Sequence, residues 1–213
     1  KELQKDLPSA GRTSFTRQQE PLGLGHAVWC ARELVGNQPF ALLLPDMIFR
    51  AEPGVLKQMI QAYEETGGNI IGVEEVDPAE TASYGIVARG EGPDSGFRIT
   101  GMVEKPQPKD APSNLFISGR YILQPEIFTL LAEQTRGAGG EIQLTDAMQT
   151  LIRQQRFTGV KYDGKGFDCG SKIGFLTANV VFALDREDLA PQFLAELEKL
   201  GLGRTAAFDK LQG

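Results

Sequence analysis

The sequence predicts an α/β protein in which a mixed, mostly parallel sheet carries helices on both faces. Residues 41–44 form an unbroken apolar run, Ala-Leu-Leu-Leu, that stops at Pro45 and Asp46. Such a run is typical of a strand buried on both faces, as in a parallel sheet covered by helices. A helical pattern at 55–65 and an apolar strand at 69–74 follow in the order of a right-handed parallel crossover. A length of 213 residues, of which 41% are hydrophobic, suits one domain of this kind.

Composition and charge exclude several classes of protein. The net charge is −6 and the two signs are interspersed, which argues against a protein built to bind nucleic acid or an anionic membrane. The sequence has no run of about 18 apolar residues, so it predicts no membrane-spanning helix. No signal-peptide pattern is seen, and Cys30 and Cys169 are the only cysteines, so we expect a cytoplasmic protein that needs no disulfide. With a single histidine, a Cys/His metal cluster is excluded.

The first forty residues predict little regular structure before the first helix. Residues 1–8 are predicted to be the end of a polar helix, and the alternation at 13–18 predicts a short strand. A proline and two glycines mark a loop at 19–25, and residues 26–34 continue as a helix. A loop of this kind can bring its backbone close to a ligand, although most such loops are ordinary turns. His26 alone is more often structural than catalytic, because nothing beside it completes a triad.

Beyond residue 74 the pattern alternates between strands and helices. Strands are predicted at 84–88, 97–104, 115–123 and 157–162. Apolar residues at helical spacing and proline starts predict helices at 125–131, 142–152, 173–184 and 191–200. A hairpin-type loop is expected at 90–96 and a turn at 163–166.

Acidic residues stand at the ends of three predicted segments. Asp46 ends the 41–44 strand, at the edge where open α/β sheets bind ligands. Glu104 ends another strand with Lys105 beside it, and Asp168 lies between a turn and a helix. Two aspartates with a Glu-Lys pair can hold a divalent metal and offer a lysine to a phosphate. The residues alone leave two alternatives open: Asp46 caps the next segment, and Glu-Lys-Pro is a solvated strand end.

A series of motifs in a fixed order resembles a known family. Gln18 opens the series, which continues with Gly23-Leu24-Gly25-His26-Ala27, Leu44-Pro45-Asp46, Tyr84-Gly85, Val103-Glu104-Lys105-Pro106, Pro112-Ser113-Asn114-Leu115, Gly119-Arg120-Tyr121, Gly140-Glu141-Ile142-Gln143-Leu144-Thr145-Asp146 and Asp168-Cys169-Gly170. From about residue 13 to residue 200 the chain resembles the bacterial UTP–glucose-1-phosphate uridylyltransferases, or UDP-glucose pyrophosphorylases, which are sugar nucleotidyltransferases. The resemblance implies a Rossmann-like mixed sheet with helices on both faces and a smaller sugar-binding portion.

The resemblance also implies a role for particular residues. Gln18 and the backbone of Gly23 are expected to contact the uracil. Asp46 and Asp168 are expected to hold Mg²⁺, and Lys105 to neutralise glucose 1-phosphate. The residues expected beside the glucose are Gly85, Glu104 and Gly119. The motif at 140–146 is expected only to start its helix.

One departure from the family pattern is large. The family opens with a Gly-rich loop, broadly Gly-x-Gly-Thr-Arg, that cradles the triphosphate, and this sequence has no such segment. We therefore expect a partial nucleotidyltransferase domain at 1–200 that lacks its N-terminal strands, followed by a C-terminal tail at 201–213.

The implied reaction converts UTP and α-D-glucose 1-phosphate to UDP-glucose and pyrophosphate. A related enzyme would use dTTP or ATP, although the Gly-Leu-Gly-His-Ala and Asp-Cys-Gly motifs favour UTP. A rival from another class is a non-catalytic sugar-phosphate-binding module, which the missing phosphate loop would permit. The retained Asp46, Lys105 and Asp168 argue against it. We expect a homo-oligomer with no nucleic-acid or membrane partner.

Overall fold

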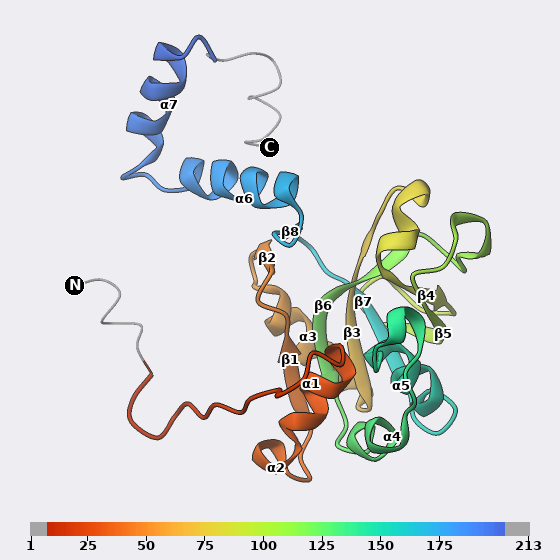
Figure 1. Ribbon diagram of the computed structural model, residues 1–213. Helices are drawn as coiled ribbons and strands as arrows, with labels where there is room; N and C mark the ends of the chain where they lie inside the picture. The colour runs from red at the N-terminus through yellow and green to blue at the C-terminus, as the bar shows by residue number, and fades with distance from the viewer. Residues whose placement is uncertain (1–7, 203–213) are drawn as a thin grey trace. The chain divides into compact units, whose positions relative to one another are not determined.

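The computed structural model describes residues 8–202, which form two compact units (Figure 1). We call residues 8–43 and 52–163 the sheet unit, and residues 44–51 and 164–202 the hairpin unit. The helix end predicted at 1–8 lies outside the described residues, apart from Pro8, and so does most of the predicted tail. The single domain predicted at 1–200 stays a prediction.

The sheet unit is built on a six-stranded sheet with the strand order β1-β6-β3-β7-β5-β4. Among the described pairs, β3 and β7 are parallel and the others are antiparallel, so the sheet is mixed, with a smaller parallel share than predicted. Both β1 and β3 run antiparallel to β6, which lies between them, so they share one direction. The strands are β1 (Phe40–Leu43), β3 (Asn69–Glu75), β4 (Gly85–Arg89), β5 (Phe97–Glu104), β6 (Leu115–Leu123) and β7 (Phe157–Lys161).

Helices cover both faces of this sheet. A Cβ at Gly72 would lie 3.2 Å from Met59 Sδ of α3 and 3.2 Å from Ser118 Oγ. Ser118 and its neighbour Ile117 point to opposite faces of β6, and Ile117 lies on the side of α5 and Gly85. The helices of this unit are α1 (Leu24–Cys30), α2 (Arg32–Val35), α3 (Val55–Thr66), α4 (Ile127–Glu133) and α5 (Leu144–Leu151), and the short 3₁₀ turns are η1 (Pro78–Ser83), η2 (Pro108–Asp110) and η3 (Ala138–Gly140).

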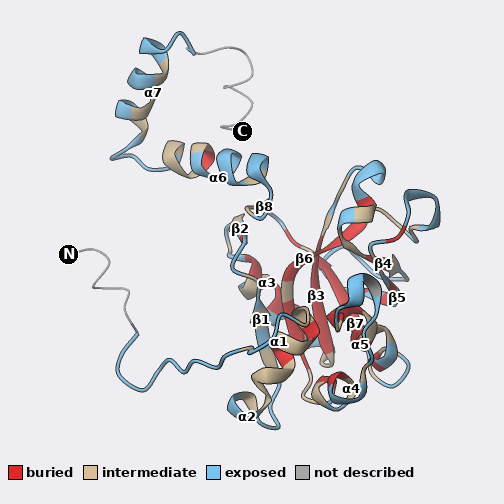
Figure 2. Cartoon of the chain, viewed as in Figure 1, coloured by how far each residue is buried: buried red, intermediate tan, exposed pale blue. Residues whose placement is uncertain are grey.

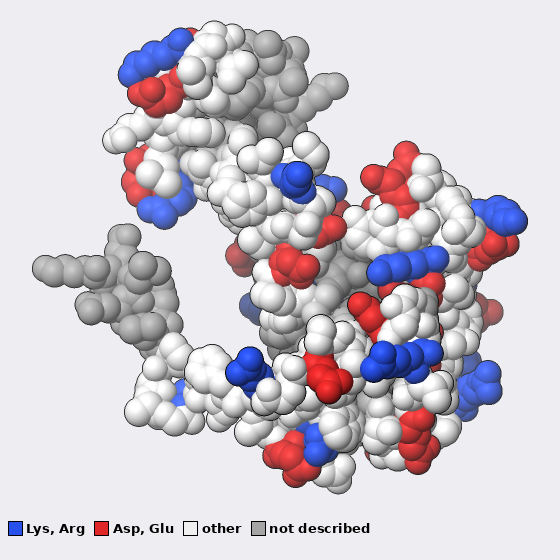
Figure 3. Space-filling view, in the orientation of Figure 1, with Lys and Arg blue, Asp and Glu red and all other residues white. Residues whose placement is uncertain are grey.

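The core of the sheet unit follows the apolar pattern of the sequence. The central strands β3 and β6 are almost entirely buried (Figure 2). In α3 the buried residues Val55, Met59 and Ala62 recur at helical spacing, and the helix ends at Gly67, whose φ is 60°. On the face of the molecule in Figure 3, acidic and basic side chains are interspersed, as the composition indicated.

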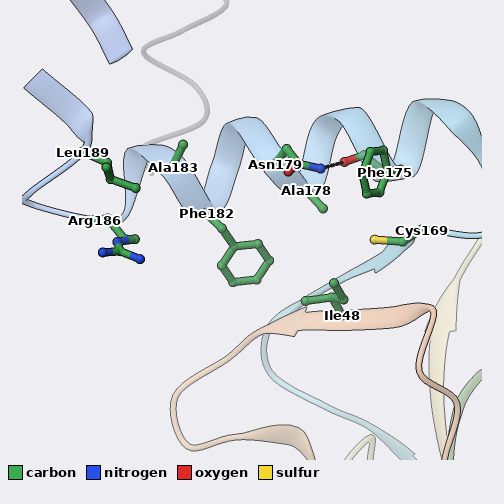
Figure 4. Close-up of a pocket in the computed structure, with 9 residues that line it drawn as sticks. All are labelled: Ile48, Cys169, Phe175, Ala178, Asn179, Phe182, Ala183, Arg186 and Leu189. Atoms are coloured by element: carbon green, nitrogen blue, oxygen red, sulfur yellow. Dashed lines mark hydrogen bonds between the residues drawn. The ribbon is translucent and has the colours of Figure 1, made fainter. Parts of the chain in front are cut away.

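The hairpin unit pairs β2 (Met47–Arg50) with β8 (Lys165–Asp168) in antiparallel fashion, and α6 (Lys172–Leu184) and α7 (Ala190–Lys199) follow. Phe167, Ala178 and Val181 form its small core. An open groove of about 430 Å³ runs between the hairpin and α6; Cys169 lines it from the hairpin side and Phe182 from α6 (Figure 4). No helix in the described part of the chain is both long and apolar enough to cross a membrane.

Two predictions about the amino-terminal half were wrong. Residues 13–18 form no strand, because no described strand lies beside them to share backbone hydrogen bonds, and Phe15 is 92% exposed. The 41–44 run is not buried on both faces. Phe40 of β1 stacks on Phe128 of α4, but Ala41 and Leu43 on the other face are exposed.

One prediction in the carboxyl-terminal half also differs from the structure. The segment predicted as a turn at 163–166 contains the first half of β8, which the sequence pattern missed along with its partner β2.

Candidate active site

The side chains of Asp46 and Asp168 converge on Gly170 in the hairpin unit. A Cβ at Gly170 would lie 3.0 Å from Asp168 Oδ1 and 3.2 Å from Asp46 Oδ2, so the two carboxylates flank one point. Asp46 is exposed and Asp168 is partly buried. The two residues are distant in sequence, and the β2–β8 pairing brings them together.

Backbone hydrogen bonds fix this carboxylate pair. Met47 is directly opposite Asp168 in the β2–β8 register, and the Cys169 N–H donates to the Asp46 carbonyl at 2.8 Å. The Gly170 N–H donates to Asp168 Oδ1 at 2.9 Å. The Ser171 hydroxyl donates to the Asp168 carbonyl at 2.9 Å and accepts from the Gly174 N–H, which starts α6. The turn that follows Asp168 is therefore held at both ends.

The donor set suits a hard cation. Two carboxylates provide only oxygen ligands, and the described residues contain no group of three or more His, Cys, Asp or Glu side chains placed to hold a metal. A structural zinc site needs four such ligands. Mg²⁺ is commonly bound through one or two carboxylates, with waters and substrate phosphates completing its shell. The pair at Gly170 fits that pattern.

Gln18 lies in a corner of the sheet unit with Gly23 and His26. Its amide nitrogen donates to the Gly23 carbonyl at 3.0 Å and lies 2.9 Å from His26 Nδ1. The Gly23 N–H, at the start of α1, has no hydrogen-bond partner among the described residues. The corner therefore offers one free backbone donor and the carbonyl oxygen of a fixed amide.

The glycine loop before α1 is docked onto the 141–142 segment. Gly23 has a φ of 99°, and a Cβ there would lie 2.7 Å from Glu141 Cβ. The Ile142 N–H donates to the Leu22 carbonyl at 2.7 Å, and the Gly25 N–H donates to the Ile142 carbonyl at 2.9 Å. Only glycine combines this backbone conformation with so close an approach. The motif at 140–146 therefore supports the Gln18 corner and does more than start α5.

Glu104 of β5 receives a hydrogen bond from a residue that the sequence did not single out. The Thr145 hydroxyl donates to Glu104 Oε2 at 2.6 Å, a length typical of a charge-assisted bond. Gly85 is directly opposite Glu104 in the β4–β5 register, and a Cβ there would lie 3.1 Å from both Glu104 Oε2 and Thr145 Oγ1. A side chain at this position would press on the carboxylate, so Gly85, Glu104 and Thr145 form one close-packed cluster.

Lys105 follows Glu104 with an unusual backbone. Its φ is 47°, the one positive value among the described non-glycine residues. The Lys105 N–H donates to the Tyr84 carbonyl at 3.0 Å, which holds this conformation, and the side chain is exposed and makes no ion pair with the described residues. Such conformations cluster at functional sites.

Gly119 lies in a bulge of β6. The register with β3 passes from Ile71 opposite Tyr121 to Val73 opposite Ile117, so three residues of β6 face Gly72. Gly119 is buried and has a φ of 71°. Bulges are frequent next to active sites, where they redirect a strand. The structure gives Gly119 a conformational role in β6, and its expected place beside the glucose stays a prediction.

The chain belongs to the nucleotidyl transferase family, which it matches over residues 1–183. It is similar to the UTP–glucose-1-phosphate uridylyltransferase of Bacillus subtilis, with 44% identity over 214 aligned residues that cover 93% of this chain and 73% of that protein. The family resemblance and the mixed α/β nucleotidyltransferase fold predicted from the sequence are thereby confirmed.

Comparison with solved structures also finds similar nucleotidyltransferases. The chain is similar to a UDP-glucose pyrophosphorylase complexed with UDP-glucose, with a TM-score of 0.79 and 40% identity over 81% of this chain. It is also similar to a UTP-bound UGPase from Acinetobacter baumannii, with a TM-score of 0.75 and 38% identity over 85% of this chain. The chain spans 66% and 63% of those two chains, so it covers just under two thirds of each.

Proposed function

We propose that the full-length protein transfers UMP from UTP to α-D-glucose 1-phosphate and releases UDP-glucose and pyrophosphate. The observation that carries the proposal is the 44% identity, over 93% of this chain, to a UTP–glucose-1-phosphate uridylyltransferase. The convergence of Asp46 and Asp168 supports it further, because a module that only binds a sugar phosphate has no need of paired metal ligands.

Each cluster of the site has a role in this proposal. Gln18 and the Gly23 backbone read the uracil, and the Gly23 N–H is a free donor for a uracil carbonyl. Glu104 accepts hydrogen bonds from glucose hydroxyls beside Gly85, while Thr145 holds one of its oxygens. Lys105 neutralises the phosphate of glucose 1-phosphate. Gly119 lies beside the glucose, in the bulge of β6.

Asp46 and Asp168 would hold the metal ion. Nucleotidyltransferases generally depend on a metal, and we propose Mg²⁺ because the two ligands are carboxylates. When bound, Mg²⁺ supplies positive charge that offsets the charge developing on the phosphates.

The reaction requires no protein nucleophile. A phosphate oxygen of glucose 1-phosphate attacks the α-phosphorus of UTP in line and forms a new P–O bond. The bond from the α-phosphorus to the bridging oxygen breaks, and its electron pair leaves on that bridging oxygen as part of pyrophosphate. The protein's contribution is then to position the two substrates and to neutralise charge. Lys105 and the metal ion that the two aspartates would hold serve neutralisation, and the Gln18 and Glu104 clusters serve positioning.

A direct experiment tests the reaction and its nearest alternatives. Purified full-length protein is incubated with glucose 1-phosphate, Mg²⁺ and each of UTP, dTTP, ATP and CTP, and the nucleotide sugar and pyrophosphate are quantified. We expect UDP-glucose and pyrophosphate in equal amounts, with UTP as the preferred donor. A preference for dTTP or ATP would assign the chain to a related enzyme, and no product with any donor would support the binding module. We further propose that the protein is a cytoplasmic homo-oligomer. Light scattering would measure the mass of the oligomer.

A further inference from the structure

We propose that His26 is a positioning residue that fixes the Gln18 amide, so that the Gln18 carbonyl oxygen reads the N3–H of uracil. The inference rests on the proposed function, in which Gln18 contacts the base. It assigns a task to the only histidine of the chain, whose hydrogen-bond partners among the described residues, Gln18 and Cys30, include no carboxylate.

The Gly23 carbonyl sets the orientation of the amide. A side-chain amide presents an NH₂ group with two donors at one corner and an acceptor oxygen at the other. The carbonyl of Gly23 can only accept, so the amide nitrogen must face it at the observed 3.0 Å. The same nitrogen lies 2.9 Å from His26 Nδ1. Both protons of the Gln18 amide are then engaged within the protein.

This arrangement also defines the tautomer of the His26 imidazole. An NH₂ group donates and does not accept, so Nδ1 of His26 must carry a lone pair, and the ring proton resides on Nε2. The Cys30 sulfur lies 3.9 Å from Nε2 and 4.0 Å from Nδ1, so it does not select between the two ring nitrogens. The ring is also stacked on Trp29, with the centroids 5.9 Å apart and the planes inclined by 21°. His26 is therefore held with its acceptor toward Gln18.

Gln18 and Gly23 therefore present a defined pattern of hydrogen-bond donors and acceptors to the base. Because both amide protons are used, Gln18 offers only its oxygen, an acceptor, while the free N–H of Gly23 offers a donor. Uracil presents a donor at N3–H between two carbonyl acceptors, which complements this pair. Cytosine presents an acceptor at N3, which would oppose the Gln18 oxygen. Thymine has the same edge as uracil, so these two groups discriminate against CTP and leave the choice between UTP and dTTP to other contacts.

The test compares variants of His26 in the full-length protein. His26→Leu replaces the imidazole with an apolar side chain of similar size that has no acceptor, so one amide proton loses its partner and the amide can rotate. We expect the ratio of kcat/KM for UTP to that for CTP to fall by about tenfold, mostly through a higher KM for UTP. The KM for glucose 1-phosphate should stay unchanged. His26→Asn, which can restore an acceptor near the position of Nδ1, should recover most of the preference.

Two controls separate this effect from a general loss of structure. Cys30→Ala removes a sulfur that contacts the ring without favouring either nitrogen, and it should leave the UTP-to-CTP ratio as it is in the wild type. The melting temperature of each variant reports on folding. If His26→Leu is folded and keeps the wild-type ratio, or if both KM values rise together, the inference is overturned. If the wild-type protein makes no UDP-glucose, the proposed function fails first, and UTP and CTP affinities measured by calorimetry on the same variants then decide whether His26 sets base preference.

Discussion

At the scale of single residues, the hydrogen bond from Thr145 to Glu104 leads to a prediction about the sugar substrate. Thr145→Val removes the hydroxyl and keeps the shape of the side chain, so Glu104 Oε2 loses its partner. We expect KM for glucose 1-phosphate to rise by about tenfold, with KM for UTP unchanged. Steady-state kinetics with each substrate varied in turn would measure this. Thr145→Ser is the matched control and should stay close to wild type; equal effects on both substrates would contradict the assignment.

Lys105 leads to a second prediction with the same substrate. Its exposed ammonium has no ion-pair partner among the described residues, so it is available to a phosphate. A charge-assisted contact contributes roughly 1.5–3 kcal/mol, so Lys105→Ala should weaken the use of glucose 1-phosphate by about ten- to a hundredfold. Binding of UTP should change far less, as titration calorimetry can establish. Losses of equal size for both substrates would show that Lys105 does not face the sugar phosphate.

Gln18 leads to a third prediction, which concerns the base. Gln18→Ala removes the amide that is held by Gly23 and His26, and it leaves the uracil edge unpaired at a cost of about 1–3 kcal/mol. We expect the choice among the four nucleoside triphosphates to relax while the requirement for a metal persists. Competition assays with mixed triphosphates would measure the choice. A variant with the full preference for UTP would rule out Gln18 as the base-reading residue.

At the scale of elements, the β2–β8 hairpin leads to a prediction about the metal. Gly170→Ala would place a Cβ 3.0 Å from Asp168 Oδ1 and 3.2 Å from Asp46 Oδ2, which is closer than ordinary van der Waals contact. The carboxylates must then move apart, and we expect the Mg²⁺ concentration for half-maximal activity to rise by about tenfold. Gly54→Ala is the control, because no atom lies within 4 Å of the added carbon. An unchanged magnesium requirement in Gly170→Ala would contradict the site.

The elements also show where sequence patterns predict structure well and where they fail. The bounds of β5 and β6 match the predicted strands at 97–104 and 115–123, because most of their apolar residues are buried within the sheet. The β2 and β8 strands were missed because each has four residues of mixed type, and their pairing depends on a partner more than a hundred positions away. The alternation at 13–18 suggested a strand, but a strand also requires a neighbour to pair with.

The residues of the candidate site were also predicted only in part. Gln18, Gly23, Glu104 and the two aspartates stand in motifs that point to them. Thr145 and His26 act through Glu104 and Gln18, and hydrogen bonds across 41 and 8 positions carry no periodic signal in a sequence. The motif at 140–146 contains Thr145 and was the available clue to it, but the start of a helix was a sufficient explanation for the whole motif.

At the scale of the whole molecule, the class of fold was predictable and the strand order was not. Alternating strand and helix patterns indicated an α/β protein, and a strand–helix–strand order indicated that β1 and β3 run in one direction. The insertion of β6 between them comes from a segment 40 residues further along the chain, which no local pattern specifies. The division into a sheet unit and a hairpin unit follows from long-range contacts in the same way.

The measurement that tests the central claim most directly is the magnesium dependence of UDP-glucose synthesis by wild-type protein and by Asp46→Asn. The amide keeps the shape of the carboxylate and removes its charge, so the variant should keep the wild-type circular dichroism spectrum and melting behaviour. We expect the wild-type protein to form UDP-glucose from UTP and glucose 1-phosphate only when Mg²⁺ is added. Asp46→Asn should lose most of that activity at every magnesium concentration. Activity close to wild type in a folded Asp46→Asn variant would contradict the metal site formed by Asp46 and Asp168.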